Sequence, residues 1–292
     1  MNNDLLSIVI PSKNERFLRQ TVEDVLRNSV TNIEVIVMLD GYSVPDAERV
    51  HDDRVRYFEE PETLYSKKRQ NVNKAIREYS NGEFVCWMDG HCSVDHAWDA
   101  KILEVLKNDP KMVIVPQRRR LDPFDWCEQV QDHRKPHVDF EHFLWHGLRD
   151  NHSLHGFRWD QLSIDRKDEM VSDIMTSQGS MFIMSKEWYL KCGFFTDLGY
   201  QGWGQEAESV VMGSLWNGGR SCVAKNTFYT HWHKGKSGRG YHLPKTELLK
   251  SYAYSFNKWC IERKEFFINH MNNFPRQPKW PDSWIEELYN KK

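Results

Sequence analysis

The chain has 292 residues, which is enough for one large domain or two small ones with a sizeable core. Its 40 basic and 42 acidic residues leave a formal net charge of -2, so no overall charge favours a polyanionic partner, although this balance does not exclude local basic clusters. Six cysteines without a Cys-x-x-Cys pair argue against a zinc knuckle or a redox motif, and no apolar run approaches the roughly 20 residues of a membrane span. We therefore expect a soluble, cytoplasmic protein without a membrane span.

Strand and helix patterns alternate through the first 117 residues. Buried strands are predicted at 5–10, 33–40, 82–89 and 112–117, an edge strand at 54–60, and helices at 15–28, 66–80 and 97–109. Such alternation is typical of parallel strands joined by right-handed crossovers. The sequence therefore predicts an α/β fold with a mostly parallel open sheet flanked by helices.

Polar residues follow three of these strands at the point where each strand ends. They are "PSKNE" at 11–15, "DGYSVPD" at 40–46 and "DGH" at 89–91. Open α/β sheets bind ligands beyond the carboxyl ends of their strands. Carboxylates at three strand ends therefore predict one shared site.

The remaining chain divides into three parts. Residues 118–176 are mostly polar, rich in His and Trp and only weakly periodic, and they form either a functional insertion with some helix or a solvated excursion stabilised by its own aromatics. A strand and a short helix are predicted within 177–195, a helix ending at Gly218 and Gly219 within 199–219, and a strand at 220–225. A helical extension is predicted at 245–292, so residues 1–244 are expected to form one domain.

Asp89 and His91 follow a predicted core strand and can point the same way if the chain turns at Gly90. A carboxylate and an imidazole together suit a divalent cation that keeps further positions open, and Mn²⁺ matches this ligand mix better than a closed zinc site does. The alternative interpretation is an Asp that caps the next helix beside an unrelated His.

Four motifs then occur in order: "DGHC" at 89–92, "QGSMFIM" at 178–184, "WGQEA" at 203–207 and "THWHKGK" at 230–236. As a set they resemble the GT-A-fold glycosyltransferases of the family-2 type. The second half is similar to the polypeptide N-acetylgalactosaminyltransferases, in which the metal motif is Asp-x-His. The resemblance implies a Rossmann-like GT-A fold with a nucleotide-sugar-binding half at 1–117, an acceptor-side insertion at 118–176 and a sugar and acceptor half at 177–244.

The resemblance also implies a ligand set for Mn²⁺ or Mg²⁺. Its members are Asp89, His91 and His231, with His233 as the alternative third ligand. Lys234 or Lys236 is then expected beside the donor diphosphate.

The same resemblance places further residues at the donor. Pro11, Glu15 and Asp40 are expected to hold the nucleobase and ribose, with Arg69 and Asn71 near the diphosphate or ribose. For Arg69 the alternative is a solvated helix face. Glu206 is expected to hold the hydroxyls of the donor sugar, and Trp203 to form a wall beside the sugar or the acceptor.

The sequence departs from the family pattern at Ala207, where inverting relatives carry Asp and the N-acetylgalactosaminyltransferases carry Asn. Glu208 is offset by one residue and on a helix is expected to face away from Glu206. Either Glu206 or Glu208 is the general base, or the enzyme retains configuration and needs no base from the protein.

The function expected from these features is a hexosyl- or N-acetylhexosaminyl-type glycosyltransferase. It takes a nucleoside-diphosphate sugar, with UDP favoured, and acts on a hydroxyl of a saccharide, a protein or a modified base in DNA, in a bacterial or virus-infected cell. Basic segments at 116–122 and 233–240 motivate the DNA alternative. Other classes are a nucleotidyltransferase, whose glycine-rich loop is missing after the first strand, and a non-catalytic nucleotide-sugar-binding protein, suggested by Ala207.

Overall fold

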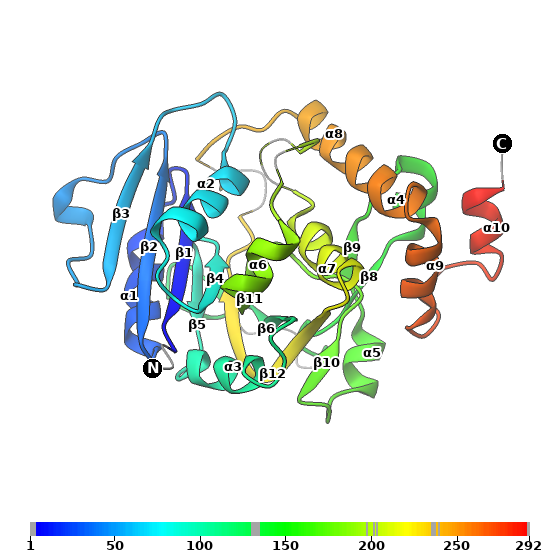
Figure 1. Ribbon diagram of the computed structural model, residues 1–292, viewed down its shortest axis with the longest axis horizontal. Coiled ribbons are helices and arrows are strands. Elements are labelled where there is room, and N and C mark those ends of the chain that lie inside the picture. The colour runs from blue at the N-terminus through cyan, green and yellow to red at the C-terminus, as the bar shows by residue number, and fades with distance from the viewer. Residues whose placement is uncertain are drawn as a thin grey trace.

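The computed structural model describes residues 4–129, 135–196, 198–200, 202, 204–234, 238 and 240–290. Its main sheet has ten strands, eight of which follow the order β10-β12-β6-β11-β4-β1-β2-β3 (Figure 1). In chain order these eight are β1 (Leu6–Ser12), β2 (Ile33–Asp40), β3 (Val55–Glu60), β4 (Phe84–Met88), β6 (Met112–Asp122), β10 (Val171–Asp173), β11 (Met181–Ser185) and β12 (Arg220–His231). The short strands β5 (Cys92–Val94) and β7 (Cys127–Glu128) pair with β12 and β6.

Helices cover both faces of the sheet. In Figure 1, α2 (Lys68–Lys74), α6 (Lys186–Cys192) and α7 (Glu206–Trp216) lie in front of it, and α1 (Leu18–Asn28) lies behind. The helix α3 (Trp98–Leu106) precedes β6, and a short 3-10 turn occupies Asp46–Glu48. The predicted α/β fold with a mostly parallel sheet flanked by helices is therefore confirmed.

The parallel strands β1, β2 and β4 are buried along almost their whole length, as their continuous apolar runs predict. The strand β3 lies at the edge, as predicted, and is only half-buried. The helix predicted at 66–80 is α2 followed by one π turn at Ala75–Tyr79.

Two strands run further than their apolar runs indicate. The strand β6 continues past Gln117 through three arginines, and β12 continues from Ala224 to His231 after a shift of register. The two strands pair in parallel along these polar ends, so backbone hydrogen bonding extends them beyond the core. The apolar pattern stops at 117 and 225 because many of the side chains beyond these points are polar, although Arg118, Tyr229 and His231 remain buried in the sheet.

Residues 135–176 form an ordered insertion with buried aromatic side chains. It contains a two-stranded sheet of β8 (Glu141–Phe143) and β9 (Gly156–Arg158), together with α4 (Trp145–Asn151) and α5 (Asp160–Asp165). Phe140, Phe143 and Trp159 are at most 4% exposed. The described part of this insertion is therefore packed against the rest of the protein and is not a solvated excursion.

The chain ends in helices. These are α8 (Lys245–Phe256) with a π turn at Asn257–Ile261, then α9 (Lys264–Asn272) and α10 (Trp284–Tyr289), to the right of the sheet in Figure 1. The indole of Trp280, between α9 and α10, donates a hydrogen bond of 2.8 Å to the carbonyl of Phe143 in the insertion. Within the described ranges no helix has both the length and the apolar composition that a bilayer span requires.

Asp99 ties α3 to the loop after α1 far from the strand ends. Its buried carboxylate accepts hydrogen bonds from the backbone of Val30 and from the backbone and hydroxyl of Thr31. We expect Asp99→Ala to lower the free energy of unfolding by about 3 kcal/mol, because the substitution leaves these donors without their acceptor. Urea denaturation measures the change. The exposed Asp53→Ala is the control and should change stability by no more than about 0.5 kcal/mol, and equal stabilities of the two variants would contradict this account.

Candidate active site and metal centre

A cavity of about 540 Å³ lies at the carboxyl ends of β1, β2 and β4 and is bordered by α2, α7 and the insertion. Its volume is in the range of small-molecule sites. The cavity lining includes most of the residues that the sequence predicts for the site: Pro11, Glu15, Asp40, Asn71, Asp89, His91, Glu206, Glu208, His231, His233 and Lys234.

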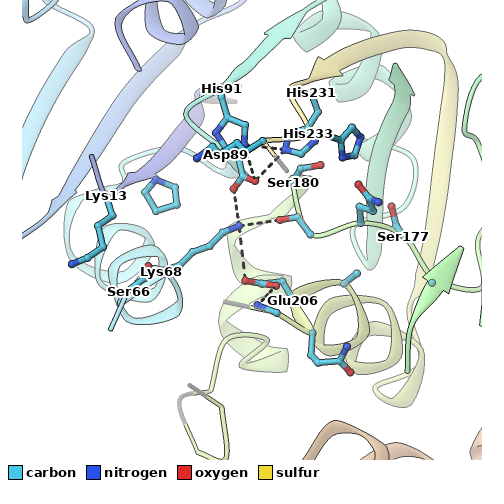
Figure 2. Close-up of a pocket in the computed structure, with 18 of the residues that line it drawn as sticks. Lys13, Ser66, Lys68, Asp89, His91, Ser177, Ser180, Glu206, His231 and His233 are labelled. Atoms are coloured by element: carbon cyan, nitrogen blue, oxygen red, sulfur yellow. Dashed lines mark hydrogen bonds and ion pairs between the residues drawn. The ribbon is translucent and has the colours of Figure 1, made fainter. Parts of the chain in front are cut away.

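Asp89, His91 and His231 meet in this cavity (Figure 2). The Oδ2 atom of Asp89 lies 3.7 Å from Nε2 of His91 and 3.5 Å from Nε2 of His231, and the two Nε2 atoms are 3.0 Å apart. Asp89 follows β4 directly. His231 arrives at the end of β12, where its pairing with Cys92 of β5 sets it beside His91.

The donor set fits a divalent cation. Neighbouring ligand atoms around an octahedral ion with bonds of about 2.1 Å lie about 3 Å apart, and the distances in this cluster are close to that value. Burial lowers the pKa of His231 to about 4, with the nearby His91 adding to the effect, so its imidazole is neutral at pH 7. Burial opposes ionisation of Asp89, but Lys68 and the two imidazoles hold its pKa below the usual range. One carboxylate and neutral imidazoles are the forms that bind a metal, and Mn²⁺ accepts both.

Glu15 supports His91 from behind. Its Oε2 lies 3.1 Å from Nδ1 of His91, and its carboxylate also pairs with Lys234. Burial opposes ionisation, but the hydrogen bond and charge of His91 together with Lys234 lower the pKa of Glu15 overall. This arrangement fixes the ring so that Nε2 faces Asp89 and His231. Lys234, predicted beside a diphosphate, is held in this structure by Glu15.

Lys68 is a central residue of the cavity that the sequence analysis misses. Its ammonium donates to Oδ1 of Asp89 at 2.6 Å and to the carbonyl of Gly179 at 3.0 Å, and it lies 3.9 Å from Oε1 of Glu206 (Figure 2). Burial would lower the pKa of Lys68, but the charges of Asp89 and Glu206 raise it overall. The cation therefore connects the metal cluster to the start of α7.

The helical repeat explains why Lys68 lines the cavity and Arg69, which was predicted from the family resemblance, does not. Residues two apart on a helix point in nearly opposite directions, whereas residues three apart share a face. Lys68 and Asn71 accordingly both line the cavity. Arg69 is 1% exposed, and it donates to the carbonyl of Gly204 and to Ser209 and is not part of the lining. The solvated-face alternative for Arg69 is wrong, and its contact with a donor stays a prediction.

Asp40 lies at the end of β2 beside Lys13. Its Oδ2 accepts from the backbone of Lys67 at 2.8 Å, whereas Oδ1 has no hydrogen-bond partner among the described residues and lies 3.5 Å from the ammonium of Lys13. The Asn71 side-chain nitrogen is also buried without such a partner. Polar atoms with unused hydrogen-bonding capacity thus face the cavity on this side as well.

The start of α7 brings Glu206 and Glu208 to the same cavity. The expectation that Glu208 faces away from Glu206 is wrong here, because residues 205–208 all line the cavity and α7 meets it with its end. Oε2 of Glu206 accepts from the backbone of Gly204 at 2.8 Å. Burial, with the charges of Glu206 and Glu141 adding to it, raises the pKa of Glu208 to about 8.

The remaining predicted residues have different outcomes. His233 is exposed and packs edge-on against the ring of His231, while the ligand cluster contains His231. Trp203 and Lys236 lie outside the described residues. Glu141 of β8, which also lines the cavity, had no local signal in the sequence because it lies in the irregular insertion.

The sequence profile described as Glycosyl transferase family 2 matches residues 7–191, which contain β1, β4 and the Asp89 motif. The chain belongs to glycosyl transferase family 2. Polypeptide N-acetylgalactosaminyltransferase 14 of Homo sapiens is 27% identical over 68% of this chain and 35% of its own length. Polypeptide N-acetylgalactosaminyltransferase 5 of Caenorhabditis elegans is 23% identical over 91% of this chain and 43% of its own length.

A solved structure is similar as well. The crystal structure of GalNAc-T7 with UDP, GalNAc and Mn²⁺ superposes with a TM-score of 0.72 and 18% identity, over 100% of this chain and 55% of the other. That similarity shows that the chain has the GT-A fold expected from its sequence. The chain spans less than half the length of the two curated relatives named above.

We expect Glu15→Gln to weaken Mn²⁺ binding by about 10- to 100-fold, since residues that orient a metal-bound His contribute effects of this size. Calorimetric titration with Mn²⁺ measures the affinity independently of any enzymatic activity. Glu23→Gln, on the exposed face of α1, is the matched control and should bind Mn²⁺ as the unaltered protein does. Equal affinities of the two variants would show that Glu15 does not orient His91.

Proposed function

We propose that this protein is a metal-dependent glycosyltransferase that moves a sugar from a UDP-sugar to an acceptor hydroxyl. The observation that carries the proposal is the cluster of Asp89, His91 and His231 in the cavity at the strand ends of a family 2 chain. The similar crystal structure was determined with UDP, GalNAc and Mn²⁺, which supports this choice of donor and cation.

The donor nucleoside is assigned to the side of Lys13 and Asp40. Lys13 and Ser66 lie on one side of Asp89 in Figure 2, close to the ends of β1 and β2. The Asp40 oxygen that makes no hydrogen bond and the amide nitrogen of Asn71 offer an acceptor and a donor to a base or ribose. Pro11 supplies part of the wall.

The leaving diphosphate is assigned to the part of the cavity beside Lys68 and the cluster of Asp89, His91 and His231. These three residues would hold a divalent cation, which would supply positive charge to offset the charge of the departing diphosphate. Lys68 adds a fixed ammonium next to it, and in a buried site such a charge acts strongly because water does not screen it. Glu206, 3.9 Å from Lys68, is positioned to accept hydrogen bonds from the hydroxyls of the donor sugar.

Glu208 is the better candidate for general base. A base is most effective when its pKa lies near the working pH, and burial raises the pKa of Glu208 to about 8. Glu206 remains the alternative, as does a mechanism that retains configuration without a base from the protein. The cytoplasmic location in a bacterial or virus-infected cell stays a prediction.

The acceptor hydroxyl belongs to a saccharide, a protein or a DNA base. The two curated relatives described above are named polypeptide N-acetylgalactosaminyltransferases, which is the argument for a protein acceptor. The DNA alternative rests on a basic rim. Arg118 of this rim is buried against Glu141, and Arg119 pairs with Glu128, while residues 235–237 and 239 lie outside the described ranges. Two of the three arginines at 118–120 are thus already neutralised.

The first test is the release of UDP from UDP-sugars by the purified protein, with Mn²⁺ and with a chelator. We expect UDP release that requires the metal and falls by at least about 100-fold in His231→Ala, because a cation ligand is lost. The exposed His51→Ala is the control and should be fully active. UDP release at the same rate with chelator and in His231→Ala would overturn the metal-dependent mechanism. Release of pyrophosphate instead of UDP would indicate a nucleotidyltransferase, and binding without turnover a non-catalytic protein.

The base assignment predicts a pH dependence. Glu208 faces the carboxylates of Glu206 and Glu141 and the hydroxyl of Thr176, and it is protonated below its pKa of about 8. Since a base acts only when deprotonated, kcat/KM should rise about tenfold per pH unit up to pH 8 and then level off. In Glu208→Gln the rate should fall by about 100-fold or more and this rise should vanish.

Glu206→Gln is the matched control for this pH profile. It should lower the rate through weaker donor binding yet keep the rise with pH. A rise with pH that persists in Glu208→Gln would contradict its role as base and favour transfer without a protein base.

A further inference from the structure

Three buried oxygen atoms in the cavity have no hydrogen-bond partner among the described residues. They are Oε2 of Glu141, Oε1 of Gln205 and Oε1 of Glu206, and each residue is at most 6% exposed. All three side chains line the same cavity. A buried acceptor without a hydrogen bond is destabilising, so these oxygens favour a ligand that supplies hydrogen-bond donors.

Glu141 is held so that one of its oxygens stays available. Its Oε1 accepts from the guanidinium of Arg118 at 2.8 Å, and both side chains are buried. Gly156 of β9, which pairs with Phe143, leaves space beside the other oxygen, since a Cβ there would lie 3.2 Å from Oε2. The ion pair with Arg118 therefore fixes the carboxylate, and its unpaired oxygen is buried beside Gly156, which lines the cavity together with Glu141.

Gln205 and Glu208 continue this surface at the start of α7. The amide nitrogen of Gln205 donates to the carbonyl of Leu154 at 2.9 Å, so its oxygen is the end left without a donor. Glu208 accepts from Thr176, which bridges to Glu141 through its backbone. The insertion, which includes Thr176, and α7 thus contribute to one set of oxygen acceptors.

The charge distribution separates this set from the donor side. The described lysines that line the cavity are Lys13, Lys68 and Lys234, and they pair with Asp40, Asp89 and Glu15, while Lys68 also lies 3.9 Å from Glu206. Arg118 is neutralised by Glu141 within the set. Oxygen acceptors and carboxylates without a spare cation repel phosphate and attract O–H groups.

We infer that Glu141, Gln205 and Glu208 form an acceptor subsite for a neutral, polyhydroxylated saccharide. Two of its hydroxyls donate to Glu141 and Gln205, which places a further hydroxyl at Glu208 for transfer. The inference rests on the proposed function and names its acceptor class. A polyanion such as DNA offers phosphates to a surface at which the described lysines of the lining, and Arg118, already pair with carboxylates.

The test compares acceptors under a common UDP-sugar donor with Mn²⁺. The probes are a panel of neutral mono- and disaccharide methyl glycosides, a duplex with a hydroxymethylated base and a peptide containing Ser and Thr, with products identified by mass spectrometry. We expect transfer to a saccharide and not to the duplex or the peptide. Transfer to the duplex or the peptide with none to the saccharides would overturn the inference.

The variants test the residues. Glu141→Gln should raise the acceptor KM by about 10- to 100-fold, the effect of losing a hydrogen bond to a charged group, while UDP binding with Mn²⁺ is unchanged. Glu128→Gln is the matched control, because Glu128 pairs with Arg119 as Glu141 pairs with Arg118 but does not line the cavity. The acceptor KM of Glu128→Gln should stay within about twofold of the value for the unaltered protein, because a partly exposed ion pair contributes little.

A second variant covers the case in which Glu141→Gln does not fold. Gln205 has a left-handed backbone with φ of 60°, which Asn tolerates, so Gln205→Asn shortens the amide without strain. It should raise the acceptor KM severalfold, while the affinity for UDP with Mn²⁺, measured calorimetrically, stays as in the unaltered protein. An unchanged acceptor KM in the folded variants would refute the subsite. Absence of both UDP binding and UDP release would instead remove the proposed function, and the subsite with it, whereas UDP release without transfer to any saccharide would refute the subsite alone.

Discussion

The carboxylate of Asp89 lies between a lysine on one side and two histidines on the other. The arrangement of the site depends on these contacts. Lys68 donates to one oxygen at 2.6 Å, and the imidazoles of His91 and His231 approach the other. A buried carboxylate is stable only when such partners offset its lost hydration. Burial lowers the pKa of His231 and keeps its imidazole neutral, so that it can bind a cation together with Asp89. On the other side, the ammonium of Lys68 lies near Glu206.

Two features of the sheet bring these groups together. The strand β11 runs antiparallel beside β4, and the carbonyl of Ser180 accepts from the backbone of Asp89 at 2.9 Å. The pairing of β12 with β5 sets His231 opposite Cys92, next to His91, across 140 residues of sequence. The proposed donor side lies at the ends of the parallel strands β1, β2 and β4. The proposed acceptor side is formed by α7 and the insertion, which carries Glu141.

Whether a part of the fold or of the site could be predicted from the sequence depends on how far apart along the chain its interacting residues lie. The core strands and the meeting of Asp89 with His91 were predictable, because buried apolar runs and polar strand ends are local patterns. Lys68 was accessible in principle, since Asn71 lies one helical turn away from it, but the choice of Arg69 ignored that spacing. Glu141 had no local signal, because its position is set by the pairing of β8 with β9 and by the buried Arg118.

The claim that Asp89, His91 and His231 hold a divalent cation is tested most directly by anomalous scattering at the manganese edge, from crystals grown with Mn²⁺ and UDP. The account predicts one strong peak at bonding distance from Oδ2 of Asp89 and Nε2 of both histidines, with the UDP phosphates on its open side. Crystals that contain UDP in the cavity but show no manganese at these three residues, or show it on a different set of ligands, would contradict the account.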